Sequence, residues 1–112
     1  MTFKRKSNKN WGFDTSAIHA EQEADAATGA VITPIYATST FVQEAPGVHK
    51  GFDYGRSHNP TRYAYERAVA NLEGGTNGFA FSSGMAATAS VLDMLESGAH
   101  VVASDNIYGG TY

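Results

Sequence analysis

A short turn at Ser82, Ser83 and Gly84 carries residue types that suit anion binding. The sequence FSSGMAA places this turn between a short apolar run and an alanine-rich stretch that is typical of a helix. The free N–H groups and the positive dipole end of a first helical turn can hold a phosphate, and a glycine lets the phosphate approach the backbone closely. The turn is therefore a candidate phosphate site, although such junctions are also common in α/β folds for purely structural reasons.

Two further candidates are the tripeptide Tyr54-Gly55-Arg56 and Tyr108, which precedes two glycines. An arginine offers planar donors suited to phosphate, and a tyrosine hydroxyl can add a hydrogen bond or help to move a proton. Tyr108 comes just after the second apolar run, which is expected to be a strand. Ligands of open α/β sheets bind beyond the carboxyl ends of the strands, so the Tyr108 ring could stack on a ligand. Read alone, the tripeptide also fits a surface pair, and Tyr108 also fits an ordinary loop residue.

Other kinds of site are disfavoured by the sequence. It contains no cysteine, which removes disulfides, thiolate metal ligands and a cysteine nucleophile. The four histidines lack the spacing of metal ligands, so we predict no metal site. Neither a G-x-G-x-x-G nor a G-x-x-x-x-G-K-[ST] motif occurs, and Ser83 lacks the G-x-S-x-G setting of a hydrolase nucleophile.

The elements expected to position the candidate residues lie in the second half of the chain. The sequence predicts a helix over 60–73, because Asn59 is a suitable cap, a proline follows it, and a Gly-Gly pair ends the stretch. A second helix is expected over 84–96, between short buried strands at 78–82 and 100–104. A strand, a helix and a strand in this order form a right-handed parallel crossover, the unit of α/β folds.

The preceding residues have a different character, with short apolar patches interrupted by Gly, Pro, Ser and Thr. We expect an extended arm over 1–58, with a short helix at 15–20 and β-prone segments at 30–32 and 38–42. An incomplete α/β domain then covers 59–112. Because one crossover cannot bury both faces of a sheet, we expect the chain to be the N-terminal part of a larger protein.

Charge and hydropathy exclude further classes of function. The net charge is -3, and four of the eight basic residues lie within the first ten positions, which leaves an acidic body. That balance argues against nucleic-acid binding, and the basic terminus reads either as a solvated end or as a signal for an anionic surface. No apolar run approaches the ~20 residues of a membrane span, and no signal-peptide core is present, so we expect a cytoplasmic protein without membrane binding.

Five motifs in order resemble the Cys/Met-metabolism family of pyridoxal-phosphate enzymes: TPIYATSTF (33–41), YGRSHNPTR (54–62), LEGG (72–75), FSSGMAA (81–87) and YGGTY (108–112). The resemblance covers about residues 18–112. It implies an α/β fold of the aspartate-aminotransferase-like type I class, with pyridoxal 5'-phosphate as cofactor. It also implies a homotetramer built as a dimer of dimers, in which the arm contacts the neighbouring subunit.

The resemblance further implies a role for each candidate residue. Tyr54 and Arg56 reach the cofactor phosphate of a neighbouring subunit. The backbone N–H groups of Gly84 and Met85 hold the phosphate in their own subunit, and Tyr108 stacks on the pyridine ring. Tyr54 and Tyr108 are also implied to be catalytic, in proton transfer or in contact with the substrate.

The implied reaction is trans-sulfuration on a small amino-acid substrate. The cystathionine γ-lyases are the favoured members, with cystathionine γ-synthases and homoserine sulfhydrylases as alternatives. YGGT in place of YGCT argues against methionine γ-lyases, and the NPTR and YGGT forms argue against β-lyases of the enteric type. His58 stands where many members have glycine, a departure that resembles some bacterial γ-lyase-like sequences.

The residues that complete the chemistry are expected beyond Tyr112. In the family a lysine and a carboxylate that hold the cofactor come later in the chain, and none of the four lysines here stands in the family's lysine context. We therefore expect these 112 residues to be inactive alone. A non-catalytic fragment or an assembly module is the alternative from another class of function.

Overall fold

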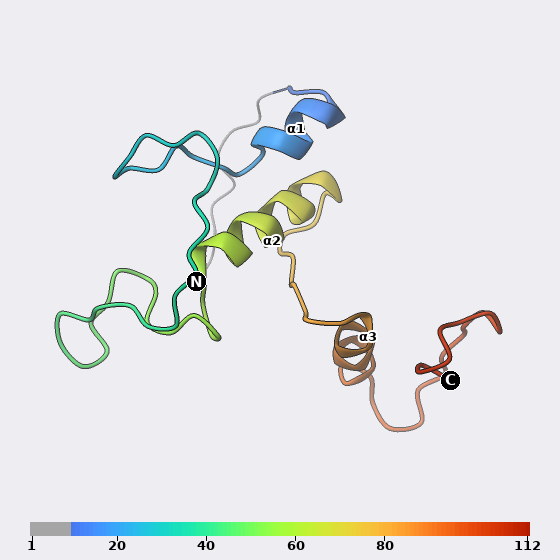
Figure 1. The fold of residues 1–112 in the computed structure, drawn as a ribbon. Helices are drawn as coiled ribbons and strands as arrows, with labels where there is room; N and C mark the ends of the chain where they lie inside the picture. Colours follow the sequence, from blue (N-terminus) through green and yellow to red (C-terminus); the bar gives the residue numbers. More distant parts are fainter. Residues whose placement is uncertain (1–9) are drawn as a thin grey trace. The chain divides into compact units, whose positions relative to one another are not determined.

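The computed structural model describes residues 10–112, which contain three α-helices (Figure 1). They are α1 (Phe13–His19), α2 (Pro60–Leu72) and α3 (Gly84–Leu92). The chain divides into two compact units, of which the first ends at Phe79 and the second covers Ala80–Tyr112. The basic residues predicted to form a solvated terminus fall within 1–9, outside the described residues.

Helix α2 begins where the sequence predicts, because Asn59 caps it. The Asn59 Oδ1 atom accepts hydrogen bonds from the backbone N–H groups of Thr61 (2.9 Å) and Arg62 (3.4 Å), and a proline occupies the first helical position. The helix ends at Leu72, one residue before the expected end, and Gly74 follows with a φ of 66°. The predicted helix is therefore confirmed.

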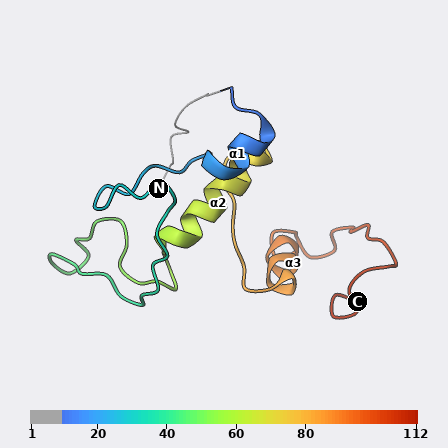
Figure 2. The same ribbon diagram turned by 45° about the horizontal axis from the view of Figure 1, so that its top comes forward.

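Helix α1 packs against α2 in the first unit (Figure 2). It overlaps the short helix predicted at 15–20. Among residues 10–112 the buried apolar side chains are all alanines, namely Ala20, Ala64 and Ala70. Alanines bury little apolar area, so they contribute little hydrophobic free energy. Polar contacts must therefore contribute much of the order in this unit.

The two strands predicted at 78–82 and 100–104 are not formed. Among the described residues the β-type pairings are two isolated bridges, Thr40 with Tyr54 and Ala45 with Val48. Phe79 is 77% exposed and Val102 is 88% exposed, so neither segment is buried. A strand is stabilised by backbone partners at its edges and by side chains over its faces, and residues 10–112 supply neither to these segments. The predicted crossover is therefore wrong for this structure.

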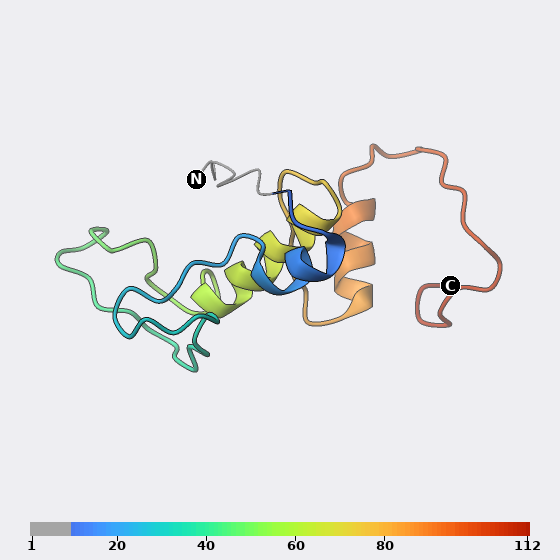
Figure 3. The same ribbon diagram turned by 90° about the horizontal axis from the view of Figure 1, so that it is seen from above.

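Helix α3 begins at the predicted residue but ends four residues early, at Leu92 instead of position 96. Beyond it, Met94 and Leu95 donate their N–H groups to carbonyls three residues back, which tightens the chain into turns. Gly98 then adopts a φ of 88°, and the rest of the second unit follows an irregular course (Figure 3). Within the described part of the chain, no helix has the length and apolar character needed to cross a membrane.

The predicted division into an arm at 1–58 and a cofactor domain at 59–112 concerns roles in an assembled enzyme, and it stays a prediction. The chain divides between Phe79 and Ala80, so α2 belongs to the same unit as the segment before it. A variant at the start of α2 therefore tests the stability of the first unit.

Replacing the α2 cap should destabilise the protein. Asn59→Ala removes the cap and also a hydrogen bond from Asn59 Nδ2 to the Tyr36 carbonyl. We expect it to lower the free energy of unfolding by about 1–2 kcal/mol, measured as a lower midpoint of thermal unfolding of the full-length gene product.

The matched control is Asn71→Ala, in the last turn of the same helix. Among residues 10–112 the Asn71 side chain makes no hydrogen bond, and alanine favours a helix more than asparagine does. Equal midpoints for the two variants would contradict the role of the cap.

Candidate functional site

The start of α2 fastens an earlier segment of the first unit. Asn59 Nδ2 donates to the Tyr36 carbonyl at 3.0 Å. The Thr61 hydroxyl donates to the Pro34 carbonyl at 2.9 Å and accepts from the Tyr36 N–H at 2.9 Å. The motif at 33–41 and the NPTR residues at 59–62 therefore form one hydrogen-bonded structure, although the bonded residues lie more than twenty positions apart.

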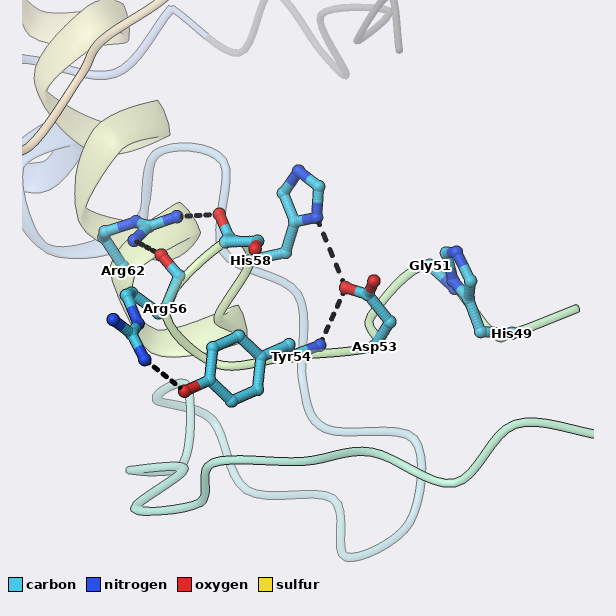
Figure 4. Close-up of polar contacts among 8 residues, drawn as sticks. His49, Gly51, Asp53, Tyr54, Arg56, His58 and Arg62 are labelled. Carbon is cyan, nitrogen blue, oxygen red and sulfur yellow. Dashed lines mark hydrogen bonds and ion pairs between the residues drawn. The ribbon is translucent and has the colours of Figure 1, made fainter. Parts of the chain in front are cut away.

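Arg62 holds the loop that precedes α2 (Figure 4). Its Nη1 atom donates to the Arg56 carbonyl at 3.0 Å, and its Nη2 atom donates to the Ser57 carbonyl. Its Nε atom lies 3.4 Å from Glu66 Oε1, one helical turn further along. The sequence analysis assigned no role to Arg62, and the signal that could have found it is this i,i+4 pair of opposite charges.

The structure brings together Tyr54 and Arg56, both of which the sequence analysis singled out. Arg56 Nη2 donates a hydrogen bond to Tyr54 Oη at 2.7 Å, and the Arg56 guanidinium carbon lies 5.3 Å from the centre of the Tyr54 ring (Figure 4). Tyr54 is 37% exposed, and Arg56 is also exposed. The pair therefore offers a cation and a hydroxyl to a ligand from outside the first unit.

The backbone of this tripeptide packs closely against a neighbouring segment. Tyr54 forms a β-bridge with Thr40, and the Gly55 N–H donates to the Ser39 carbonyl at 2.6 Å. A Cβ atom at Gly55 would lie 2.5 Å from the Thr38 carbonyl oxygen, closer than real Cβ contacts come. Glycine is therefore required at position 55 by close approach of two backbones.

Asp53 precedes the pair and carries a stabilised negative charge. Its Oδ1 atom accepts the Tyr54 N–H at 2.7 Å. That hydrogen bond holds the pKa of Asp53 below its usual value, although partial desolvation acts in the opposite direction. The pKa is lowered further by the backbone N–H of Asp53 itself and by nearby His49 and His58. Asp53 is therefore a carboxylate at neutral pH.

In the second unit the first turn of α3 has the donors of an anion site. Ser83 Oγ caps the helix by accepting the Ala86 N–H at 3.1 Å. The N–H groups of Gly84 and Met85, at the first two helical positions, have no acceptor among the described residues. A Cβ at Gly84 would meet no heavy atom within 4 Å. Two free donors, the helix dipole and open space fit a phosphate group.

Tyr108 lies on a turn beside this helix start. Its carbonyl accepts the Thr111 N–H at 2.8 Å, and Thr111 Oγ1 lies 3.0 Å from the sulfur of Met85. A Cβ at Gly110 would come within 2.5 Å of the Tyr108 ring, so glycine lets the ring lie over the turn. Tyr108 is 74% exposed, which leaves a ring face available for stacking.

The predicted site residues thus form two groups, one in each unit. Tyr54 and Arg56 form the first group, and Gly84, Met85 and Tyr108 form the second. That the two groups meet at one cofactor across a subunit interface stays a prediction. Within residues 10–112 no three His, Asp or Glu side chains gather as metal ligands.

Comparison with known proteins extends over nearly the whole chain. The family model described as Cys/Met metabolism PLP-dependent enzyme matches residues 14–112. A cystathionine β-lyase of Coxiella burnetii is 59% identical over 106 residues, which are 95% of this chain and 27% of that protein. A probable cystathionine γ-synthase of Herpetosiphon aurantiacus is 47% identical over 103 residues, 92% of this chain and 32% of the relative.

A solved structure is similar as well. The crystal structure of a cystathionine γ-lyase of Lactobacillus plantarum, complexed with L-serine, is 44% identical with a TM-score of 0.78. The match covers 90% of this chain and 26% of that protein. This chain therefore has the fold of the corresponding part of that protein, and it spans between a quarter and a third of the length of these relatives.

Gly55→Ala should disturb the loop of the Tyr54–Arg56 pair. The added Cβ would collide with the Thr38 carbonyl, so one backbone must move away, at a cost of about 1–3 kcal/mol. We expect a lower unfolding midpoint of the full-length gene product and faster limited proteolysis within residues 38–56. Gly109→Ala is the control, because a Cβ there meets nothing within 4 Å. Equal proteolysis of the two variants would show that the close approach is absent.

Proposed function

Because this chain belongs to the Cys/Met metabolism family of PLP-dependent enzymes, as its five motifs predicted, we propose that the protein carrying it is a carbon–sulfur lyase of trans-sulfuration. Members of this family depend on pyridoxal phosphate. The observation that carries the proposal is that relatives named after cystathionine match 90–95% of the chain. These relatives are enzymes, so they do not support the alternative of a non-catalytic fragment or assembly module.

We propose cystathionine as the substrate, with elimination at Cγ as the first candidate reaction. This reaction yields cysteine, 2-oxobutanoate and ammonia. It is the first candidate because the motif forms YGGT and NPTR argue against methionine γ-lyases and β-lyases of the enteric type. Elimination at Cβ, which yields homocysteine, pyruvate and ammonia, is the second candidate. It is favoured by the 59% identity to the Coxiella burnetii β-lyase. The sequence argument counted only against β-lyases of the enteric type, so it does not oppose this relative.

The chain's own residues bind and orient the cofactor in this proposal. Pyridoxal phosphate, when bound, supplies a ring that withdraws electrons from the substrate's Cα, so that a proton can leave. The N–H groups of Gly84 and Met85 bind the phosphate at the start of α3. Tyr108 packs its exposed ring on the cofactor ring, over a turn that Gly110 keeps narrow.

Tyr54 and Arg56 supply a cation and a hydroxyl donor to the phosphate of a neighbouring subunit. Since Arg56 donates to Tyr54 Oη, the phenolic O–H is left free to donate elsewhere, either to a phosphate oxygen or toward the reacting carbons. The side chains of Tyr54 and Arg56 are both exposed in the first unit, as a site completed by a second chain requires. We propose the assembly to be a homotetramer, built as a dimer of dimers.

The products made from cystathionine test the reaction. We expect the full-length gene product, loaded with pyridoxal phosphate, to release 2-oxobutanoate and cysteine, measured by mass spectrometry. Release of pyruvate and homocysteine would select the Cβ reaction instead. If the protein binds the cofactor but releases neither 2-oxo acid, the proposed lyase activity is wrong.

Mixed oligomers test the sharing of sites between subunits. Arg56→Ala and Tyr108→Ala should each reduce activity at least about tenfold, because each removes one of the two residue groups. When the two variants are co-expressed, about half of the dimers are mixed, and each mixed dimer regains one intact site, so we expect about a quarter of wild-type activity.

The control for this experiment pairs two changes in the same group. When Arg56→Ala is co-expressed with Tyr54→Ala, each site of a mixed dimer receives one of the two changes from the neighbouring subunit. This mixture should therefore restore no activity. If the Arg56→Ala and Tyr108→Ala mixture were no more active than its separate components, the two groups would belong to one subunit.

A further inference from the structure

We propose that His58, acting through the carboxylate of Asp53, is a positioning residue that fixes the loop at 54–56 when its imidazole is protonated. The inference rests on the function proposed above, because the loop carries the groups offered to the cofactor phosphate. At position 58 this chain has a histidine where many members of the family have glycine.

His58 reaches Tyr54 in two ways. The His58 backbone N–H donates to the Tyr54 carbonyl at 2.9 Å. The His58 Nδ1 atom lies 3.7 Å from Asp53 Oδ1, and that same oxygen accepts the Tyr54 N–H at 2.7 Å (Figure 4). The two ends of the loop are therefore joined by a side-chain pair, which we call the Asp53–His58 clasp. Arg56 lies on the loop between them.

The clasp depends on the proton of the imidazole. A separation of 3.7 Å is too long for a hydrogen bond but is within the range of an ion pair, so attraction requires a charged histidine. Imidazoles ordinarily gain a proton near pH 6.5. Asp53 keeps its charge throughout that range, because the Tyr54 N–H lowers the pKa of its carboxyl. The clasp should thus form on the acidic side of neutrality and loosen on the alkaline side.

Other titratable side chains lie near His58. His58 shares a cavity of about 340 Å³ with α2 and the segments beside it, and the titratable side chains that also line this cavity are Glu21, Tyr63, Glu66 and Arg67. The Tyr63 ring meets the His58 imidazole edge-on at 5.7 Å. Carboxylates, phenols and guanidinium groups ordinarily titrate far from pH 6–8.

His49 is the other histidine close to Asp53, and it is engaged differently. Its Nδ1 atom accepts the Gly51 N–H at 3.1 Å, so this nitrogen carries no proton in the observed geometry. Protonation there would break that hydrogen bond rather than form one. Because His49 also acts on the charge of Asp53, it is left unchanged in the variants that test His58.

The test is the pH dependence of cofactor affinity. Apo full-length gene product is titrated with pyridoxal phosphate between pH 5.5 and 8.5, and the dissociation constant is read from the cofactor's absorbance. His58→Gln keeps the polar side chain but cannot be charged. We expect its affinity to match wild type at pH 8 and to be about two- to fivefold weaker at pH 6, the range of exposed ion pairs.

Two further variants separate the clasp from general damage. Asp53→Asn should lose the pH-dependent part, and the double change of Asp53 and His58 should add nothing to it. Identical profiles for wild type and His58→Gln would overturn the clasp while leaving the proposed function intact. If the wild-type protein bound no cofactor at any pH, both proposals would be overturned.

Discussion

Hydrogen bonds from the first turn of α2 to backbone carbonyls of the preceding segments are the interaction on which the first unit depends. The buried apolar side chains among residues 10–112 are alanines, which bury too little area to order the long segments around α2. Asn59, Thr61 and Arg62 instead donate to carbonyls at four positions of the loops before the helix. Each such bond contributes only about 1 kcal/mol net, but together they fix two loops against one helix end.

This arrangement gives the candidate site its geometry. The loop of Tyr54 and Arg56 is held on one side by Arg62 and on the other by the bridge to Thr40. Gly55 permits that bridge because a larger residue would strike the opposite backbone. The residues of the NPTR motif therefore position the site without belonging to it, which explains in physical terms why chemistry-bearing and structural residues occur together in one motif.

The features that the sequence predicts well are local ones. The start of α2 follows from the Asn59 cap and the proline after it, its end follows from the glycine pair at 74–75, and the start of α3 follows from Ser83 and Gly84. The predicted strands at 78–82 and 100–104 are not formed, because strands require partners that residues 10–112 do not supply. Tyr54 and Arg56 were singled out by residue type, whereas the bonds of Asn59 and Thr61 to residues 34 and 36 depend on how distant segments of the chain meet.

The two groups of the candidate site suit parts of a cofactor rather than parts of one substrate. Free N–H groups at α3 suit a phosphate, and Tyr108 offers a ring face for stacking. Binding the phosphate and the ring of a cofactor is a task that does not depend on which carbon–sulfur bond is broken or made. A chain built around them should therefore be similar to β-lyases, γ-lyases and γ-synthases alike, as observed. It follows that selectivity among these reactions is set by groups that contact the substrate's side chain.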